Sequence, residues 1–147
     1  MNFFTTMHYI QKYLSPSSCI LEIGAGTGRY SHTLAQQGYT VDAMELVAHN
    51  IEIFRQHTLP TEAITITEGN ALNLSASPDN QYDITLLLGP LYHLYTVADK
   101  RKALQEAIRV TKPGGIIFDA YVISDSCLLD EGFYYCQLTT CKKAKYI

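Results

Sequence analysis

Hydrophobic residues along this chain form short continuous runs that alternate with stretches in which every third or fourth residue is apolar. The runs are typical of strands buried on both faces of a parallel sheet, and the stretches are typical of amphipathic helices. Strands are expected at 19–23, 39–45, 63–67, 82–88 and 115–122, and helices at 5–14, 29–37, 48–57 and 97–110. This alternation predicts an α/β fold with a doubly wound, Rossmann-like parallel sheet.

The same pattern gives expectations for single side chains. In the last predicted helix, Ala103, Leu104, Ala107 and Ile108 lie on the apolar face and are expected to be buried. His32, near the start of the second predicted helix, is expected at the surface. Both expectations depend on which face of each helix packs against the sheet.

The periodic pattern ends near Ser124. We therefore expect one domain over residues 1–123 and an irregular tail over residues 124–147. A chain of 147 residues is long enough to bury a single hydrophobic core.

Composition argues against several partners. The formal net charge is −3 and no basic patch is present, so nucleic acid is not expected as a partner. No apolar run approaches the roughly 20 residues that cross a bilayer, so no membrane partner is expected either. The cysteines lack the spacing of a zinc site and are interpreted as reduced thiols, which predicts a cytoplasmic protein without a metal: Cys19, Cys127, Cys136 and Cys141.

A glycine-rich turn follows the first predicted strand. Gly24, Gly26 and Gly28 stand at the spacing G-x-G-x-G, and Arg29 occupies the position where a dinucleotide fold would place its third glycine. Glycine lets the chain turn sharply and lets a ligand approach the backbone, and the helix that follows offers unpaired N–H groups to an anion. Glu45 closes the second predicted strand, 17 residues after Gly28, where its carboxylate can accept from two ribose hydroxyls. The turn and the acid together predict a nucleoside-binding site.

At these residues the chain resembles the class I S-adenosylmethionine-dependent methyltransferases. Residues 21–28, Leu-Glu-Ile-Gly-Ala-Gly-Thr-Gly, resemble the family's first motif, and Glu45 matches its ribose-binding acid. Residues 69–71 resemble the adenine-contacting motif G-D-A, with Asn70 in place of the aspartate. Similar segments occur at 82–94 and 112–115, so the resemblance covers most of the chain.

The resemblance implies a strand order of 3-2-1-4-5 and S-adenosyl-L-methionine as the cofactor. It implies that the turn of Gly24, Ala25, Gly26 and Gly28 holds the methionine end and that Glu22 orients it. Glu45 would bind the ribose, Asn70 and Ala71 the adenine, and Gly89 would pass close to the sulfonium.

Tyr92 and His93 follow the fourth predicted strand, where a small-molecule methyl acceptor is expected to enter. His93 has a side chain suited to general base catalysis near neutral pH. The alternative is that His93 only lines the pocket.

The chain departs from the family at both ends, where it is short. An alternative function is therefore a non-catalytic core that binds S-adenosylmethionine or S-adenosylhomocysteine and needs a partner or further segments for activity. That alternative also predicts self-association through an exposed sheet edge. A nicotinamide-dependent oxidoreductase is disfavoured by the missing third glycine, and a marginally folded truncated product is a further alternative.

Overall fold

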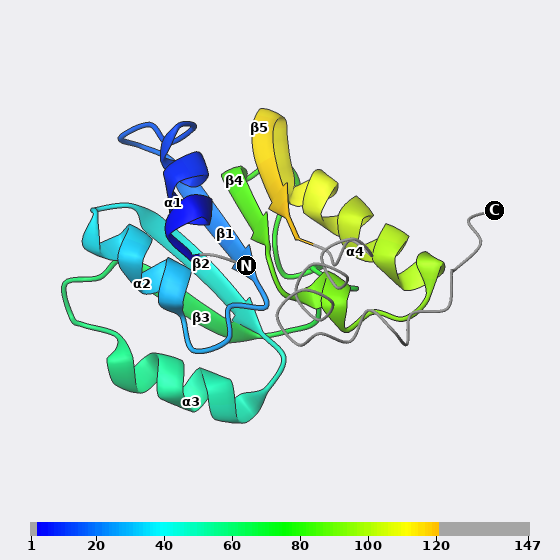
Figure 1. Ribbon diagram of the computed structural model, residues 1–147, viewed down its shortest axis with the longest axis horizontal. Helices are drawn as coiled ribbons and strands as arrows, with labels where there is room; N and C mark the ends of the chain where they lie inside the picture. The colour runs from blue at the N-terminus through cyan, green and yellow to red at the C-terminus, as the bar shows by residue number, and fades with distance from the viewer. Residues whose placement is uncertain (1–2, 121–147) are drawn as a thin grey trace, which may run out of the picture.

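The computed structural model describes residues 3–120, and its strands and helices alternate as the pattern predicts (Figure 1). The elements follow in this order: α1 (Phe3–Gln11), β1 (Cys19–Ile23), α2 (Arg29–Gln36), β2 (Thr40–Glu45), α3 (Ala48–His57), β3 (Ile64–Glu68), β4 (Tyr82–Leu87), the 3-10 helix η1 (Pro90–Tyr92), α4 (Val97–Val110) and β5 (Thr111–Asp119).

The strands form a five-stranded sheet of order β3-β2-β1-β4-β5, and each neighbouring pair is parallel. This confirms the predicted doubly wound α/β fold. The winding direction reverses between β1 and β4. In sheets of this kind a ligand binds outside the carboxyl ends of the strands at that reversal.

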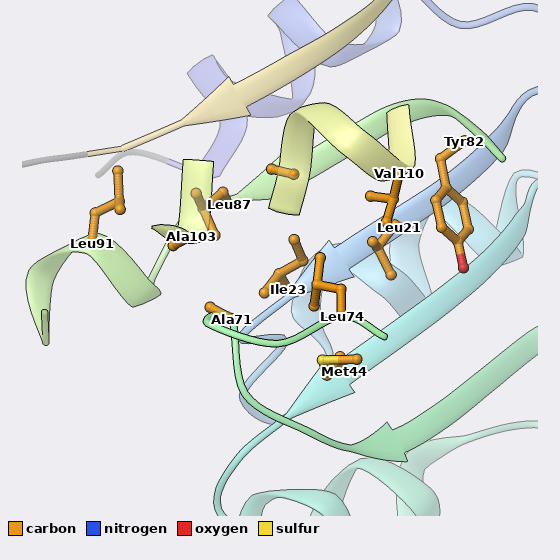
Figure 2. Close-up of a cluster of buried hydrophobic side chains, with 11 residues drawn as sticks. Leu21, Ile23, Met44, Ala71, Leu74, Tyr82, Leu87, Leu91, Ala103 and Val110 are labelled. Carbon is orange, nitrogen blue, oxygen red and sulfur yellow. The ribbon is translucent and has the colours of Figure 1, made fainter. Parts of the chain in front are cut away.

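Two hydrophobic layers cover the sheet because successive side chains of a strand point to opposite faces. On one face, Ile20 of β1 packs with Ile10 of α1 and Leu34 of α2, and Phe54 of α3 packs against Ala43. Figure 2 shows the layer on the other face, where α4 lies: Leu21, Ile23, Met44, Ala71, Leu74, Tyr82, Leu87, Leu91, Ala103, Ala107 and Val110.

The predicted bounds of β1, α3 and α4 agree with the structure, whereas β5 begins four residues earlier than its predicted start at 115. Thr111 pairs with Tyr82, and pairing then resumes at Ile116 with Ile84, so the segment 112–115 forms an irregular bulge inside the strand. The predicted end of this strand at 122 lies outside the described residues. So do the tail at 124–147 and three of the cysteines.

The expectation that Ile108 is buried is wrong. Ile108 is 62% exposed, while Ala103 and Ala107 are fully buried. One residue along an α-helix turns the side chain by about 100°, so a helix that presents Ala107 to the sheet turns Ile108 outward. Leu104 is half-buried, and the polar residue Glu106 is buried beside Ala107 instead.

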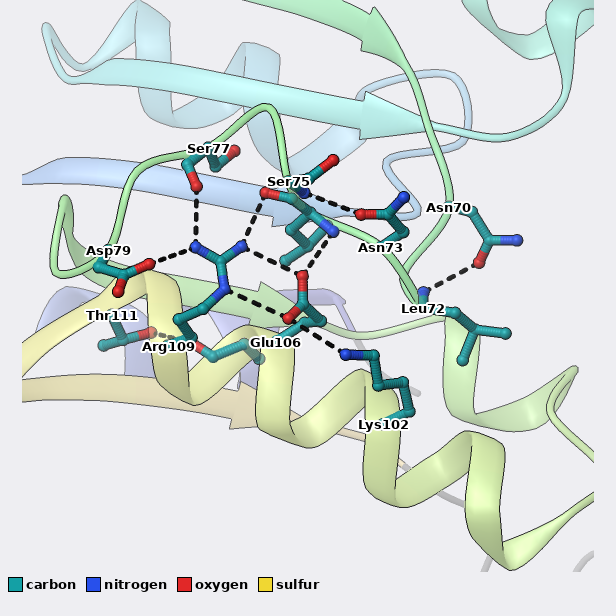
Figure 3. Close-up of polar contacts among 12 residues, drawn as sticks. Asn70, Leu72, Asn73, Ser75, Ser77, Asp79, Lys102, Glu106, Arg109 and Thr111 are labelled. Atoms are coloured by element: carbon teal, nitrogen blue, oxygen red, sulfur yellow. Dashed lines mark hydrogen bonds and ion pairs between the residues drawn. The ribbon is translucent and has the colours of Figure 1, made fainter.

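Glu106 is buried because it forms hydrogen bonds that hold the segment between β3 and β4 against α4 (Figure 3). Its carboxylate accepts from the Leu74 N–H at 2.7 Å and from the Arg109 guanidinium at 3.1 Å. Arg109 also donates to the carbonyl oxygens of Leu74 and Ser77. The Arg109 hydrogen bonds lower the pKa of Glu106 to about 2, so Glu106 stays charged. The segment fixed in this way includes Asn70 and Ala71.

Candidate functional site

The glycine turn is held against the carboxyl end of β2 by backbone hydrogen bonds. The N–H groups of Gly24 and Ala25 both donate to the Met44 carbonyl oxygen, at 2.8 and 3.0 Å. Gly28 donates to the Ala25 carbonyl oxygen at 2.9 Å, which closes the turn before α2 begins. The turn is therefore rigid and lies over the reversal between β1 and β4.

The three glycines of the turn are required for different physical reasons, although each has a positive φ. A Cβ on Gly24 would lie 2.8 Å from Cδ of Pro90, and a Cβ on Gly28 would lie 2.5 Å from the Phe54 ring. A Cβ on Gly26 would meet nothing within 4 Å. Gly24 and Gly28 thus permit close packing within the fold, and Gly26 alone borders open space.

Glu45 is 6% exposed at the end of β2, and backbone donors hold its carboxylate in place. Oε2 accepts from the Gly26 N–H at 2.8 Å, and Oε1 accepts from the Val47 N–H at 2.9 Å. Asn50 donates to Oε1 at 3.3 Å. Oε2 therefore keeps a free lone pair for a ligand hydroxyl, whereas Oε1 already accepts twice, so a second hydroxyl has to replace the longer bond from Asn50.

Glu22 lies beneath the turn and is 3% exposed. One of its oxygens accepts from both the backbone N–H and the hydroxyl of Ser31, in the first turn of α2. Burial raises the pKa of Glu22 from its ordinary 4.5 to about 7; the Ser31 hydrogen bonds oppose the rise and the nearby Glu45 charge adds to it. A group that titrates near neutral pH therefore holds the start of α2, directly after the glycine turn, through its hydrogen bonds with Ser31.

Asn70 and Ala71 lie in a tight turn that follows β3. The Gly69 N–H donates to the Glu45 carbonyl oxygen at 3.0 Å, which places this turn beside Glu45. Asn70 Oδ1 accepts from the Leu72 N–H at 2.9 Å, and the Asn70 side chain is exposed, whereas Ala71 is buried. The structure thus brings the predicted base-contacting residues next to the predicted ribose-binding acid.

Gly89, Tyr92 and His93 lie after β4, on the other side of the glycine turn. A Cβ on Gly89 would lie 3.6 Å from the Gly24 carbonyl oxygen, so the two turns are in close contact. The Gly89 carbonyl oxygen accepts from the Tyr92 N–H at 3.1 Å. Tyr92 is 39% exposed and His93 is also exposed. Within the described part of the chain, neither of these two side chains forms a hydrogen bond.

The expectation that His32 lies at the surface is wrong. His32 is half-buried: its Nδ1 lies 2.9 Å from Glu62 Oε2, and its ring packs 4.6 Å from the Phe54 ring. Its Nε2 is buried against Gly28. The Glu62 contact spans 30 residues, which explains why the helical pattern around His32 gave no sign of it.

Sequence reasoning also missed Ser31, Val47 and Asn50, which hold the two acidic side chains. Their positions offered a signal, because each lies in the first turn of a helix or just before it, two to five residues after a predicted site residue. Over residues 3–120, no cluster of three or more His, Cys, Asp or Glu side chains is arranged to hold a metal ion. No helix in that range is long and apolar enough to cross a membrane.

The glycine geometry predicts different losses of stability on substitution. Gly26→Ala strains the left-handed backbone and lowers the free energy of unfolding by about 1–2 kcal/mol. Gly28→Ala adds an overlap with the Phe54 ring and lowers it by about 2–4 kcal/mol. Urea unfolding of both variants measures the difference. Equal losses would show that Gly28 is not required by packing.

The raised pKa of Glu22 predicts a pH-dependent stability. The folded state favours the protonated acid, so this contribution is fully present below pH 4.5 and is lost as the pH rises through about 7. Relative to Glu22→Gln, the wild-type chain should lose about 1–3 kcal/mol of unfolding free energy between pH 5 and pH 8. Urea unfolding at both pH values measures this loss.

The control is Glu52→Gln, which removes a carboxylate that is 71% exposed. The difference in unfolding free energy between Glu52→Gln and the wild-type chain should change far less with pH, because the exposed pair of Glu52 with His49, at 4.0 Å, contributes little. If the Glu22→Gln difference is constant between pH 5 and pH 8, Glu22 does not titrate as the burial predicts.

Comparison with known proteins agrees with this geometry. Residues 21–119 match the family model described as "Methyltransferase domain". A demethylmenaquinone methyltransferase of Clavibacter sepedonicus is 33% identical over 67% of this chain and 38% of its own length. An S-adenosyl-L-methionine-dependent Diels-Alderase of Talaromyces variabilis is 32% identical over 69% of this chain and 35% of its own length.

A solved structure described as a SAM-dependent methyltransferase, from Methanosarcina mazei, shares the fold with a TM-score of 0.74 at 22% identity. The alignment covers 90% of this chain and 66% of that one. The chain spans less than half the length of the curated relatives named above. With the family model matched over most of the sheet and both turns of the candidate site, the chain belongs to the methyltransferase-domain family.

Proposed function

We propose that this chain binds S-adenosyl-L-methionine at the carboxyl ends of β1, β2 and β3 and serves its transfer of a methyl group to a small molecule. The observation that carries the proposal is the Glu45 carboxylate, fixed by the Gly26 and Val47 N–H groups beside the open face of Gly26. A carboxylate with two fixed oxygens is suited to the neighbouring 2′- and 3′-hydroxyls of a ribose. The names of several relatives include this cofactor or this reaction.

The remaining site residues take roles that follow from their places. The open face of Gly26 lets the methionine end approach the backbone of the turn, to which Ala25 also belongs. Glu22 acts from below the turn, through Ser31, and sets its conformation. Asn70 and Ala71 receive the adenine beside Glu45.

When bound, the cofactor supplies a methyl group that its sulfonium makes electrophilic. The chain then has to align an acceptor with that group and exclude water. The contact of Gly89 with Gly24 brings the turn after β4 close to the predicted cofactor site, and Tyr92 and His93 follow on that turn. We assign Tyr92 to the acceptor pocket and His93 to removal of the acceptor's proton.

A second function, binding of the cofactor without methyl transfer, is favoured by one observation. Within residues 3–120, neither Tyr92 nor His93 forms a side-chain hydrogen bond. A catalytic base is usually held in position by such a bond. One relative is named as an S-adenosyl-L-methionine-dependent Diels-Alderase rather than a transferase. Dependence on this cofactor therefore does not by itself imply methyl transfer. The family match leaves the nicotinamide-dependent alternative without support.

The partners follow from the same proposal. The acceptor is a small molecule, in keeping with the quinone-related name of one relative, and the net charge of −3 argues against nucleic acid. Self-association through an exposed sheet edge and a cytoplasmic location remain predictions from the sequence.

Binding of S-adenosylhomocysteine, the demethylated product, tests the proposed site. Calorimetry should show saturable binding to the wild-type chain. Glu45→Gln should weaken it by about 10- to 100-fold, because two hydrogen bonds to a charged acceptor are lost. Glu52→Gln is the matched control and should bind as the wild-type chain does. A cooperatively folded chain that shows no binding would contradict the proposal.

Turnover distinguishes the enzyme from the binding core. With a labelled methyl donor and a panel of small hydroxyl, amine and carbon acceptors, His93→Gln should lower the rate by about 100-fold or more. Its affinity for S-adenosylhomocysteine should not change. His49→Gln, on the exposed surface of α3, is the control. A His93→Gln variant with wild-type turnover would mean that His93 only lines the pocket.

A further inference from the structure

We propose that the surface cleft between α4 and the segment after β3 binds a small organic anion, and that the bound anion stabilises the turn of Asn70 and Ala71. The cleft has a volume of about 640 Å³, which is within the usual range of small-molecule sites. Three residues of that segment and three of α4 line it: Leu72, Asn73, Ser75, Lys102, Glu106 and Arg109. None of them has a role in the proposed methyl-transfer site.

The charges in the lining favour an anion, because they comprise two cations and one acid. The acid, Glu106, is already paired: its two carboxylate oxygens accept from Arg109 at 3.2 and 3.1 Å. Lys102 Nζ lies 3.6 Å from Glu106 Oε1, which is too long for a hydrogen bond, and its side chain is 55% exposed. Lys102 therefore keeps its three N–H donors for a ligand.

Arg109 supports the wall of the cleft instead of meeting the ligand. Its guanidinium donates to the side chains of Glu106 and Asp79 and to the carbonyl oxygens of Leu74 and Ser77. These bonds use its N–H groups on the protein itself. Lys102 is therefore the cation of the lining that can pair with a bound anion.

The opposite wall adds neutral donors and an apolar surface. Asn73 Oδ1 accepts from the Ser75 N–H at 3.0 Å, and within residues 3–120 neither the Asn73 NH₂ group nor the Ser75 hydroxyl has a hydrogen-bond partner. Both residues are exposed. Leu72 is half-buried and, with the methylene stem of Lys102, offers apolar contact. Donors on both walls suit an oxyanion, and the apolar surface suits an organic body.

An anion that contacts both walls links α4 to the turn after β3. The Asn73 N–H donates to the Asn70 carbonyl oxygen at 2.8 Å, and the Leu72 N–H donates to Asn70 Oδ1 at 2.9 Å. Figure 3 shows this wall facing Lys102 and Glu106 of α4. A ligand that restrains Asn73 therefore restrains Asn70. The cleft is then an effector site for the cofactor, and this last step alone rests on the proposed function.

An NMR titration of the full chain with phenyl phosphate tests the site. The backbone amides of Leu72, Asn73 and Ser75 and the Asn73 NH₂ group should shift saturably, with a dissociation constant of about 1 mM or lower. Benzyl alcohol lacks the anion and inorganic phosphate lacks the apolar group, so each should bind at least about fivefold more weakly. In the saturated complex, hydrogen exchange of the Leu72 and Asn73 amides should slow by about threefold or more.

Two variants of α4 locate the binding. Lys102→Gln should weaken phenyl phosphate by about tenfold or more, because a charged donor is lost. Lys100→Gln is the matched control: it removes the same charge from an exposed position of α4 outside the lining, and its affinity should stay within about twofold of the wild-type value.

The other outcomes decide against separate parts of the inference. No saturable shift of the lining residues up to about 10 mM phenyl phosphate, or equal weakening by both variants, overturns the site. Inorganic phosphate that binds as tightly as phenyl phosphate overturns the assignment to an organic anion. Unchanged amide exchange in the saturated complex overturns the stabilisation of the turn.

The effector role is measured separately by calorimetry. Saturating phenyl phosphate should tighten S-adenosylhomocysteine binding by about threefold or more in the wild-type chain and not in Lys102→Gln. Unchanged affinity overturns the effector role and leaves the proposed function standing. Absence of S-adenosylhomocysteine binding to the folded chain overturns the proposed function and the effector role together, and the titration still decides the anion site.

Discussion

The carboxyl end of β2 holds both turns of the candidate site, and the rest of the site depends on this contact. On one side, Met44 and Glu45 accept the N–H groups of Gly24, Ala25 and Gly26. On the other side, the Glu45 carbonyl oxygen accepts from Gly69. The acidic side chain, the glycine turn and the turn after β3 are therefore fixed relative to one another before any ligand binds, so little ordering has to accompany binding.

The sequence was sufficient to predict the element types, because buried parallel strands leave continuous apolar runs and glycines mark the turns between layers. The strand order was implied by the resemblance to the methyltransferase family. The sequence could not predict where β5 begins. That boundary depends on the pairing of Thr111 with Tyr82 across the bulge at 112–115, which is a contact between strands and not a local pattern. Ile108 was misplaced for a related reason, since the burial of Glu106 is determined by Leu74 and Arg109.

The site shows the same division between local and long-range information. Glu22, Glu45 and the glycine turn stand out in the sequence, but their partners do not. The need for glycine at positions 24 and 28 comes from Pro90 and Phe54, which are distant in the chain. Of the three glycines in the turn, only Gly26 borders open space. His32 appeared to be a surface residue because Glu62 lies 30 residues away. Long-range packing therefore determines which of the residues that stand out in the sequence are placed to contact a ligand.

A thermodynamic cycle between Glu45 and the ribose hydroxyls tests the central claim most directly. Calorimetry would compare S-adenosylhomocysteine with its 2′,3′-dideoxy analogue on the wild-type chain and on Glu45→Gln. If Glu45 binds the ribose, removing the hydroxyls should weaken binding to the wild-type chain and have little further effect on the variant. Additive losses would show that Glu45 and the ribose do not interact, and would contradict the account of this site.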